Sequence, residues 1–132
     1  VYLHEVRAPG AVSLVTEVGV RLPSLVTASG RIMLAQLPEA ELRAAYNASG
    51  ERRRYREVKD ELAAYRRQGF ATEREAVSRG QESVAVAVLD HLARPAAALA
   101  VTFAVGTADT QRLVAALTKA AQSVRGQFFG MV

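Results

Sequence analysis

The sequence predicts an α+β domain in which helices pack on one antiparallel sheet. Its 132 residues are enough for one compact domain, and half of them are hydrophobic, so a core can form. Segments typical of strands fall into two runs, which are separated by a group of helical segments and followed by one more helix. Because regular alternation of strands and helices would favour a parallel sheet, this grouping predicts the α+β class.

The strand segments are bounded by turn residues. Residues 1–6 and 11–18 are β-branched and alternating, and the turn residues RAPG between them predict a hairpin. Residues 83–90 and 96–105 are apolar and flank the turn HLARP, which predicts a second antiparallel pair. Residues 69–75 (GFATERE) are expected to form a short strand or an extended loop.

The first helix is predicted to begin after Thr27, which suits an N-cap, and to end before Pro38. Its first turn contains Ala28, Ser29 and Gly30, although a glycine inside a helix costs about 1 kcal/mol relative to alanine. Small residues at this place predict either very close packing against the turn or a ligand bound there.

Three further helices are expected. Residues 38–46 begin with a proline and acidic residues that suit a first helical turn, whereas residues 47–54 (NASGERRR) predict a loop. Residues 57–68 carry apolar side chains at helical spacing and are followed by a glycine. Residues 107–126 predict the last helix, with Gly126 as its end. The apolar face expected for it consists of Leu113, Leu117, Ala120 and Val124.

The chain is basic, with 17 Lys and Arg against 13 Asp and Glu, a net charge of +4 and a pI near 10.0. This balance is found in nucleic-acid-binding proteins, but four of the arginines lie within residues 51–57 and the others alternate with acids, which is typical of a solvated surface. There is no cysteine, and the longest apolar run, residues 95–105, is too short to cross a bilayer. These features predict a cytoplasmic protein without a membrane anchor.

The sequence lacks the motifs of phosphate-binding loops, dinucleotide-binding turns and hydrolase nucleophiles. His4 and His91 are far apart and lack the spacing of metal ligands, so neither a metal nor another cofactor is expected. Glu73 and Glu75 could serve as general acid and base only if both faced a cleft, and on a strand this spacing is equally typical of a solvated edge. No catalytic residues are predicted.

Two stretches carry a family resemblance. Residues 19–42 (GVRLPSLVTASGRIMLAQLPEAEL) contain G-x-x-x-P, a turn of small residues, G-[KR], L-A and L-P in that order. Residues 60–90 (DELAAYRRQGFATEREAVSRGQESVAVAVLD) contain a helix, R-x-x-G-[YF], an acidic stretch and G-x-x-[SC]-[VIL]-A. In series, these motifs resemble the effector-binding domain of IclR-type bacterial transcriptional regulators, and the resemblance runs essentially end to end.

The resemblance implies a GAF-like α+β domain that binds a small-molecule effector and forms homodimers or homotetramers. In that family the domain follows an N-terminal winged helix-turn-helix that binds operator DNA. Residues 1–132 would then be the effector-binding and oligomerisation domain, and the DNA-binding domain is expected to precede Val1, which agrees with a chain that starts without Met. The family implies a regulator, not an enzyme.

The resemblance also implies which residues contact the effector. Backbone N–H groups at the small-residue turn would bind a carboxylate, two hydroxyls would come from the sheet, and an acidic side chain would accept a hydrogen bond from a ligand hydroxyl. The implied effector-binding residues are Ala28, Ser29, Glu73, Ser83, Ala100 and Thr102.

Three positions depart from the family pattern. Ala76 stands where the family often has a second acid, Ala87 where it commonly has proline, and Ala100 where a serine is common. The proline shapes only the backbone, whereas the loss of polar groups at the other two positions makes the pocket less polar. An aromatic or comparatively apolar acid is therefore expected, rather than a short oxo acid.

Two other classes of function stay open on the sequence. A stand-alone nucleic-acid-binding domain could use residues 51–69 as a basic helix, with Lys59, Ala63 and Arg66 on one face, although four of the eleven charged residues there are acids that would repel phosphate. An enzyme of the same fold could use Glu73 or Ser83, but no nucleophile, base and orienting third group can be assembled from the sequence. Each implied site residue also has a structural interpretation, as close helix packing, as a satisfied strand hydroxyl or as a solvated acid.

Overall fold

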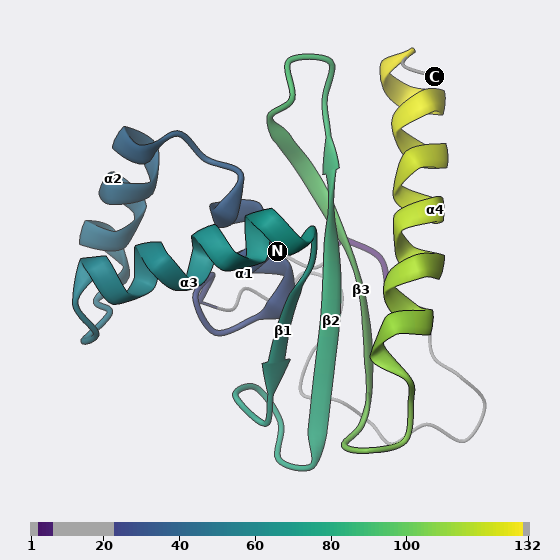
Figure 1. Ribbon diagram of the computed structural model, residues 1–132, viewed down its shortest axis with the longest axis horizontal. Coiled ribbons are helices and arrows are strands. Elements are labelled where there is room, and N and C mark those ends of the chain that lie inside the picture. Colours follow the sequence, from purple (N-terminus) through teal and green to yellow (C-terminus); the bar gives the residue numbers. More distant parts are fainter. Residues whose placement is uncertain (1–2, 7–22, 131–132) are drawn as a thin grey trace.

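The computed structural model describes residues 3–6 and 23–130, and within them it contains four helices and a three-stranded sheet. The helices are α1 (Ala28–Ala35), α2 (Glu39–Ser49), α3 (Tyr55–Gln68) and α4 (Thr110–Phe129), and the strands are β1 (Ala71–Arg74), β2 (Gln81–Leu89) and β3 (Pro95–Ala104). The sheet stands between α1, α2 and α3 on one side and α4 on the other (Figure 1). This arrangement confirms the predicted α+β class.

The central strand of the sheet is β2, which pairs antiparallel with β1 and with β3. The three strands lie where segments 69–75, 83–90 and 96–105 were expected, with small shifts at their ends. Of the first predicted hairpin, residues 3–6 belong to neither a helix nor a strand, and the remainder lies outside the described residues.

The two faces of β2 carry side chains of different size. Val84, Val86 and Val88 are buried in one hydrophobic cluster with residues of α4. Ala85 is buried in a second cluster with residues of α1 and α3, and Ala87 packs at its border. Because side chains on a strand alternate between the faces, the small residues all point to the same side. Small side chains on that face allow the α1 backbone to lie close to the sheet.

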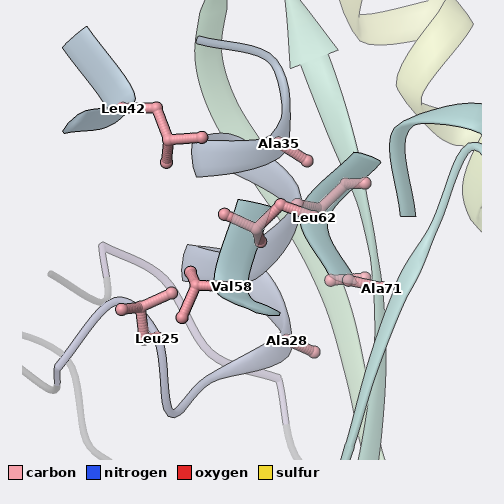
Figure 2. Packing of buried hydrophobic residues seen from close by; sticks show 9 residues of the cluster. Leu25, Ala28, Ala35, Leu42, Val58, Leu62 and Ala71 are labelled. Carbon is pink, nitrogen blue, oxygen red and sulfur yellow. The ribbon is translucent and has the colours of Figure 1, made fainter. Parts of the chain in front are cut away.

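Helix α1 is packed between the sheet and α3. Ile32 of α1 is completely buried, and Val58 and Leu62 of α3 close over it with exposed fractions of 0% and 1%. Figure 2 shows Val58 and Leu62 pointing into this cluster, with Ala71 on the strand side. Burying a side chain of this size stabilises the fold by about 1.5–3 kcal/mol. The helical spacing of 57–68 therefore predicted the core face of α3 correctly.

The first turn of α1 consists of small residues because the preceding turn of the chain packs closely against it. The Thr27 hydroxyl accepts the Gly30 N–H at 2.9 Å, which confirms the predicted N-cap. A Cβ on Gly30 would lie 2.2 Å from the Ser24 carbonyl oxygen and 2.5 Å from the Ser24 Cα. Ala28 is 1% exposed and belongs to the core. Close packing thus accounts for the glycine and for the buried alanine.

Arg31 joins three segments of the chain from within α1. Its Nε donates to the Leu25 carbonyl at 2.9 Å, and its Nη1 donates to the Thr72 carbonyl at 2.7 Å. The guanidinium therefore connects the turn before α1 to strand β1. The planar guanidinium carries several N–H donors at fixed positions, so it can bind two carbonyl groups that are far apart in sequence.

Helix α2 buries only Leu42 and is held largely by polar contacts. Glu41 receives two hydrogen bonds from Arg94 in the β2–β3 turn, at 3.0 and 2.7 Å, and Glu39 pairs with Lys59 of α3 at 2.6 Å. The prediction that 47–54 is entirely loop was wrong, because α2 continues to Ser49. It ends at Gly50, whose left-handed φ of 71° a glycine adopts without strain.

Helix α4 covers the valine face of the sheet, and its predicted end was also wrong. It continues through Gly126 to Phe129, and Gly130 adopts the left-handed terminal conformation. The buried stripe contains Leu117 and Ala121, while Ala120 is exposed. Ala121, four residues after Leu117, faces the sheet, whereas Ala120, three residues after Leu117, faces solvent.

Candidate functional site

A row of three polar side chains crosses the sheet on the face that α1 covers. Glu73 of β1 is opposite Ser83 of β2, which is opposite Thr102 of β3 in the strand register. The Ser83 hydroxyl donates to Glu73 Oε1 at 2.8 Å, and the Ser83 and Thr102 hydroxyl oxygens are 2.8 Å apart. Three residues that the sequence implied for one site are therefore hydrogen-bonded to one another.

The row is buried at one end and open at the other. Glu73 is 4% exposed and Ser83 is 9% exposed, whereas Thr102 is exposed. The second carboxylate oxygen of Glu73 accepts the Ala76 N–H at 3.1 Å. Ala76 thus contributes a backbone donor at the position where the family often has an acid. Only the Thr102 end of the row is freely accessible to a molecule in solution.

A row of alanines runs beside the polar row. In the register, Ala71, Ala85 and Ala100 are opposite one another on the same face, two residues along each strand. Ala71 and Ala85 are fully buried, while Ala100 is exposed beside Thr102. The open part of this face is consequently a small apolar surface next to a hydroxyl.

The two predicted residues of α1 are placed differently. The side chain of Ala28 points into the core, so this residue can offer only its backbone N–H to a ligand. Ser29 is half-buried. Among residues 3–6 and 23–130, no hydrogen-bond acceptor meets the N–H groups of Ala28 and Ser29, as is usual in the first turn of a helix. The structure thus places four predicted residues on one sheet face, and Ala28 and Ser29 at the start of the helix that packs on it.

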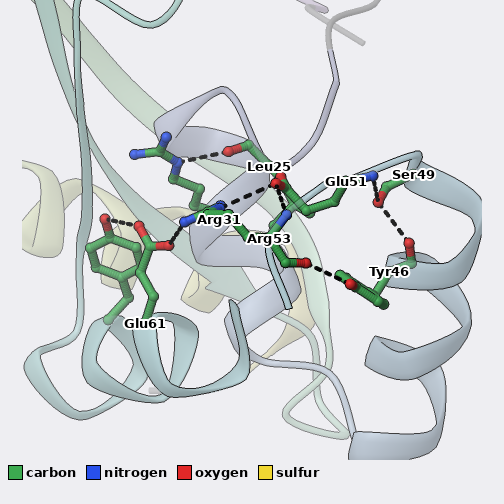
Figure 3. A network of polar contacts seen from close by, with 8 residues as sticks. Leu25, Arg31, Tyr46, Ser49, Glu51, Arg53 and Glu61 are labelled. Atoms are coloured by element: carbon green, nitrogen blue, oxygen red, sulfur yellow. Dashed lines mark hydrogen bonds and ion pairs between the residues drawn. The ribbon is translucent and has the colours of Figure 1, made fainter. Parts of the chain in front are cut away.

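A second polar network links α2 to α3 and lies outside the predicted site (Figure 3). Glu61 accepts from the Arg53 guanidinium and from the Tyr65 hydroxyl, and Arg53 also pairs with Glu51 at 3.2 Å. Tyr46 donates to the Arg53 carbonyl at 2.6 Å. Burial alone would raise the pKa of the Glu61 carboxyl, but the hydrogen bonds from Arg53 and Tyr65 outweigh burial and lower that pKa.

These contacts neutralise part of the positive charge of residues 51–69. Arg53 is taken up by Glu51 and Glu61, and Lys59, which was expected on a basic face of α3, is paired with Glu39. Helix α3 therefore presents less unpaired positive charge than residues 51–69 indicate in sequence.

A groove of about 620 Å³ lies between α1, α2 and the turn before α1, and no sequence motif predicts it. None of the six predicted effector-binding residues lines it. Its walls are Pro23, Ser24, Leu25, Val26, Leu34, Ala45, Ala48, Ser49, Gly50, Glu51 and Arg52.

The part of the chain that the structure describes contains no group of three or more potential metal-ligating side chains. Within the same residues, none of the helices is both long enough and apolar enough to span a membrane.

Residues 1–125 match the family described as bacterial transcriptional regulator IclR C-terminal. The chain belongs to this IclR C-terminal family. The match covers nearly the whole chain, including every residue of the polar row, so the resemblance carried by residues 19–42 and 60–90 is confirmed.

Individual relatives agree with the IclR assignment. The HTH-type transcriptional regulator XynR of Escherichia coli K12 is 33% identical over 125 residues, which cover 86% of this chain and 48% of XynR. The chain thus spans about half the length of this curated relative. The structure is also similar to the C-terminal domain of the E. coli transcriptional regulator KdgR, with a TM-score of 0.74 and 28% identity over 83% of this chain and 73% of that one.

A further solved structure shares the IclR fold. It is a double mutant of the inducer-binding domain of the PobR transcription factor from Acinetobacter, in complex with 3-hydroxybenzoic acid. The TM-score is 0.76 at 20% identity, over 88% of this chain and 73% of that chain.

Proposed function

We propose that this chain is the effector-binding domain of a cytoplasmic transcriptional regulator and that it binds a small organic acid between α1 and the sheet. The observation that carries the proposal is the hydrogen-bonded row of Glu73, Ser83 and Thr102, which runs from the buried interior to an accessible hydroxyl. Burying the Glu73 carboxylate and the Ser83 hydroxyl costs free energy, and the row ends at an accessible hydroxyl, so it suits a binding role better than a purely structural one.

The surroundings of the row favour a ligand with an apolar body. Ala100 provides an apolar surface next to Thr102, where the family often has a second hydroxyl. The N–H groups of Ala28 and Ser29 at the start of α1 suit the carboxylate of the ligand, since a helix N-terminus carries partial positive charge. Together these groups fit an aromatic or comparatively apolar acid.

Ligand binding would be coupled to DNA through a domain outside this chain. XynR is about twice as long as the matched region and is named as an HTH-type regulator. We propose that a preceding winged helix-turn-helix binds operator DNA and that the domain acts as a homodimer or homotetramer. An effector that binds one arrangement of the domains more tightly than another shifts the population towards it, and so changes DNA binding.

The test is a thermal-shift panel of aromatic and aliphatic carboxylates on the wild type and on Thr102→Val. A ligand at a hundred times its dissociation constant that binds only the folded state adds about 2.7 kcal/mol to stability, which gives a clear rise in melting temperature. We expect aromatic acids to give the rise and Thr102→Val to abolish it. Thr118→Val makes the same chemical change on the exposed face of α4 and should retain the rise. A rise that survives in Thr102→Val, or binding of glyoxylate or pyruvate without any aromatic acid, contradicts the proposal.

A further inference from the structure

We infer that the ligand group received at Thr102 is a hydrogen-bond donor, such as a hydroxyl or an ammonium group, and not a carboxylate. The inference rests on the proposed function, because it specifies the chemistry of the same site. It follows from counting the protons available to the polar row, beginning at its buried end.

The buried end of the row fixes the direction of the first hydrogen bond. Both oxygens of Glu73 are engaged, one by the Ala76 N–H and the other by the Ser83 hydroxyl. An ionised carboxylate accepts hydrogen bonds and donates none. The bond of 2.8 Å between Ser83 Oγ and Glu73 Oε1 therefore uses the hydroxyl proton of Ser83.

The second hydrogen bond follows from the first. A serine hydroxyl has one proton, and the Ser83 proton is already directed at Glu73. The contact of 2.8 Å between Ser83 and Thr102 can then form only if Thr102 donates its proton to Ser83 Oγ. All hydroxyl protons of the row point away from the open end and towards Glu73.

The open end of the row consequently presents lone pairs and no proton. Thr102 is exposed, and its Oγ1 keeps acceptor capacity after its proton has been given to Ser83. A ligand hydroxyl or ammonium group there extends the row by one more hydrogen bond. A carboxylate or ether oxygen would face a lone pair, or would require Thr102 to turn its proton outwards and break the bond to Ser83.

The hydrogen atoms of the row can be located without any ligand. Neutron diffraction from crystals of this chain in deuterated solvent should show deuterium on Ser83 Oγ pointing at Glu73, and deuterium on Thr102 Oγ1 pointing at Ser83. Deuterium on Ser83 that points at Thr102 overturns the inference, whether or not a ligand is known.

Glu73→Gln is expected to reverse the row. The Ala76 N–H requires an acceptor, so the amide oxygen of the glutamine should take that position and its NH₂ group should face Ser83. Ser83 would then donate to Thr102, and Thr102 would donate outwards. Ser83→Ala cuts the row instead and leaves the Thr102 hydroxyl free to turn either way.

The ligand test compares probes that differ at one substituent. Two probes, 3-hydroxybenzoate and 3-(aminomethyl)benzoate, carry a hydrogen-bond donor at that substituent, whereas 3-methoxybenzoate carries only an acceptor. Isothermal titration measures the binding of each probe to the wild type, Glu73→Gln and Ser83→Ala. We expect the better donor probe to bind the wild type at least about tenfold more tightly than the methoxy probe, the worth of one hydrogen bond. Whether the hydroxyl or the aminomethyl probe binds more tightly distinguishes a site for a hydroxyl from a site for an ammonium group. The preference should shrink in Ser83→Ala and reverse in Glu73→Gln.

The control is Glu82→Gln, which removes the same charge from the neighbouring residue on the opposite face of β2, where Glu82 accepts the Gly106 N–H. It should leave the preference unchanged. A wild-type preference for 3-methoxybenzoate overturns the inference. If no probe binds any variant, the proposed binding of aromatic acids fails, while the deuterium positions still confirm or overturn the direction of the row.

Discussion

Gly30 in the first turn of α1 and Ser24 in the preceding turn are so close that a Cβ on Gly30 would lie 2.2 Å from the Ser24 carbonyl oxygen. We expect Gly30→Ala to destabilise the domain by about 1–3 kcal/mol, since the strain of overpacking exceeds the gain in helix propensity of about 1 kcal/mol. Chemical denaturation measures the change. Ser29→Ala, at the adjacent half-buried position, is the control and should cost much less. A Gly30→Ala domain as stable as the wild type would contradict the close contact.

Arg31 is expected to matter for stability although it lies on a short helix. Arg31→Met keeps most of the aliphatic length but leaves the carbonyls of Leu25 and Thr72 without their donors. Unpaired, partly buried acceptors of this kind cost about 1–3 kcal/mol each. Urea unfolding should therefore show a loss in that range or larger. Arg56→Met changes an exposed arginine of α3 and should alter stability little, and equal losses in both variants would count against the role of Arg31.

Acid should weaken the network around Arg53. The pKa of Glu61 is lowered in the folded state, despite burial, by its hydrogen bonds from Arg53 and Tyr65, and the pKa of Glu51 is lowered by hydrogen bonds from Arg53. A carboxyl with a depressed folded pKa stabilises the fold above its unfolded pKa and loses that contribution as the pH falls through the folded value. We expect the free energy of unfolding to fall as the pH drops from about 5 towards 3.

The variant Glu61→Gln tests this acid dependence directly. Its stability should depend less steeply on pH in this window, whereas Glu57→Gln, an exposed change on the same helix that keeps the Arg53 contact, should retain the slope. Thermal unfolding at a series of pH values gives both slopes, and identical slopes in the two variants would refute the assignment.

The attachment of α2 should be sensitive to salt. Glu41 and Arg94 are both about half-exposed, so their bidentate pair is expected to show a small favourable coupling at low ionic strength and a smaller one at high salt. A double-mutant cycle with Glu41→Gln and Arg94→Gln measures the coupling. The same cycle repeated in 1 M salt should give a value near zero. A coupling that is unchanged by salt would mean that the pair is shielded from solvent.

Much of the fold could be predicted because its signals are local. The Thr27 cap, the spacing of Val58 and Leu62 and the apolar segments around the HLARP turn each depend on a few neighbouring residues. The errors arose where local composition and tertiary context disagree. Asn47 and Ser49 are turn formers, yet residues 47–49 continue α2, and Gly50 takes the terminal conformation. Gly126 likewise lies inside α4, which ends at Gly130.

The candidate site could be predicted only in part. Family motifs pointed to Glu73, Ser83 and Thr102, but no sequence spacing reveals that the register places them opposite one another, since register depends on how three strands pair. Likewise, the family motif assigned Ala28 and Ser29 to the site together, whereas the structure buries Ala28 in the core and leaves Ser29 half-buried. Whether the six residues bind an effector stays a prediction.

The alternation of small and large side chains on β2 places the residues that face α1 and the residues that pack against α4 on opposite faces of a single strand. Ser83, Ala85 and Ala87 face α1, whereas Val84, Val86 and Val88 hold α4. Under the proposed function, substitutions at Ser83, or at its partners on β1 and β3, would change which molecule is recognised while the valine layer stays as it is. On that proposal we expect specificity to change among homologues one residue at a time while the valine layer keeps holding α4, which is the condition under which a single domain can evolve to recognise many different metabolites.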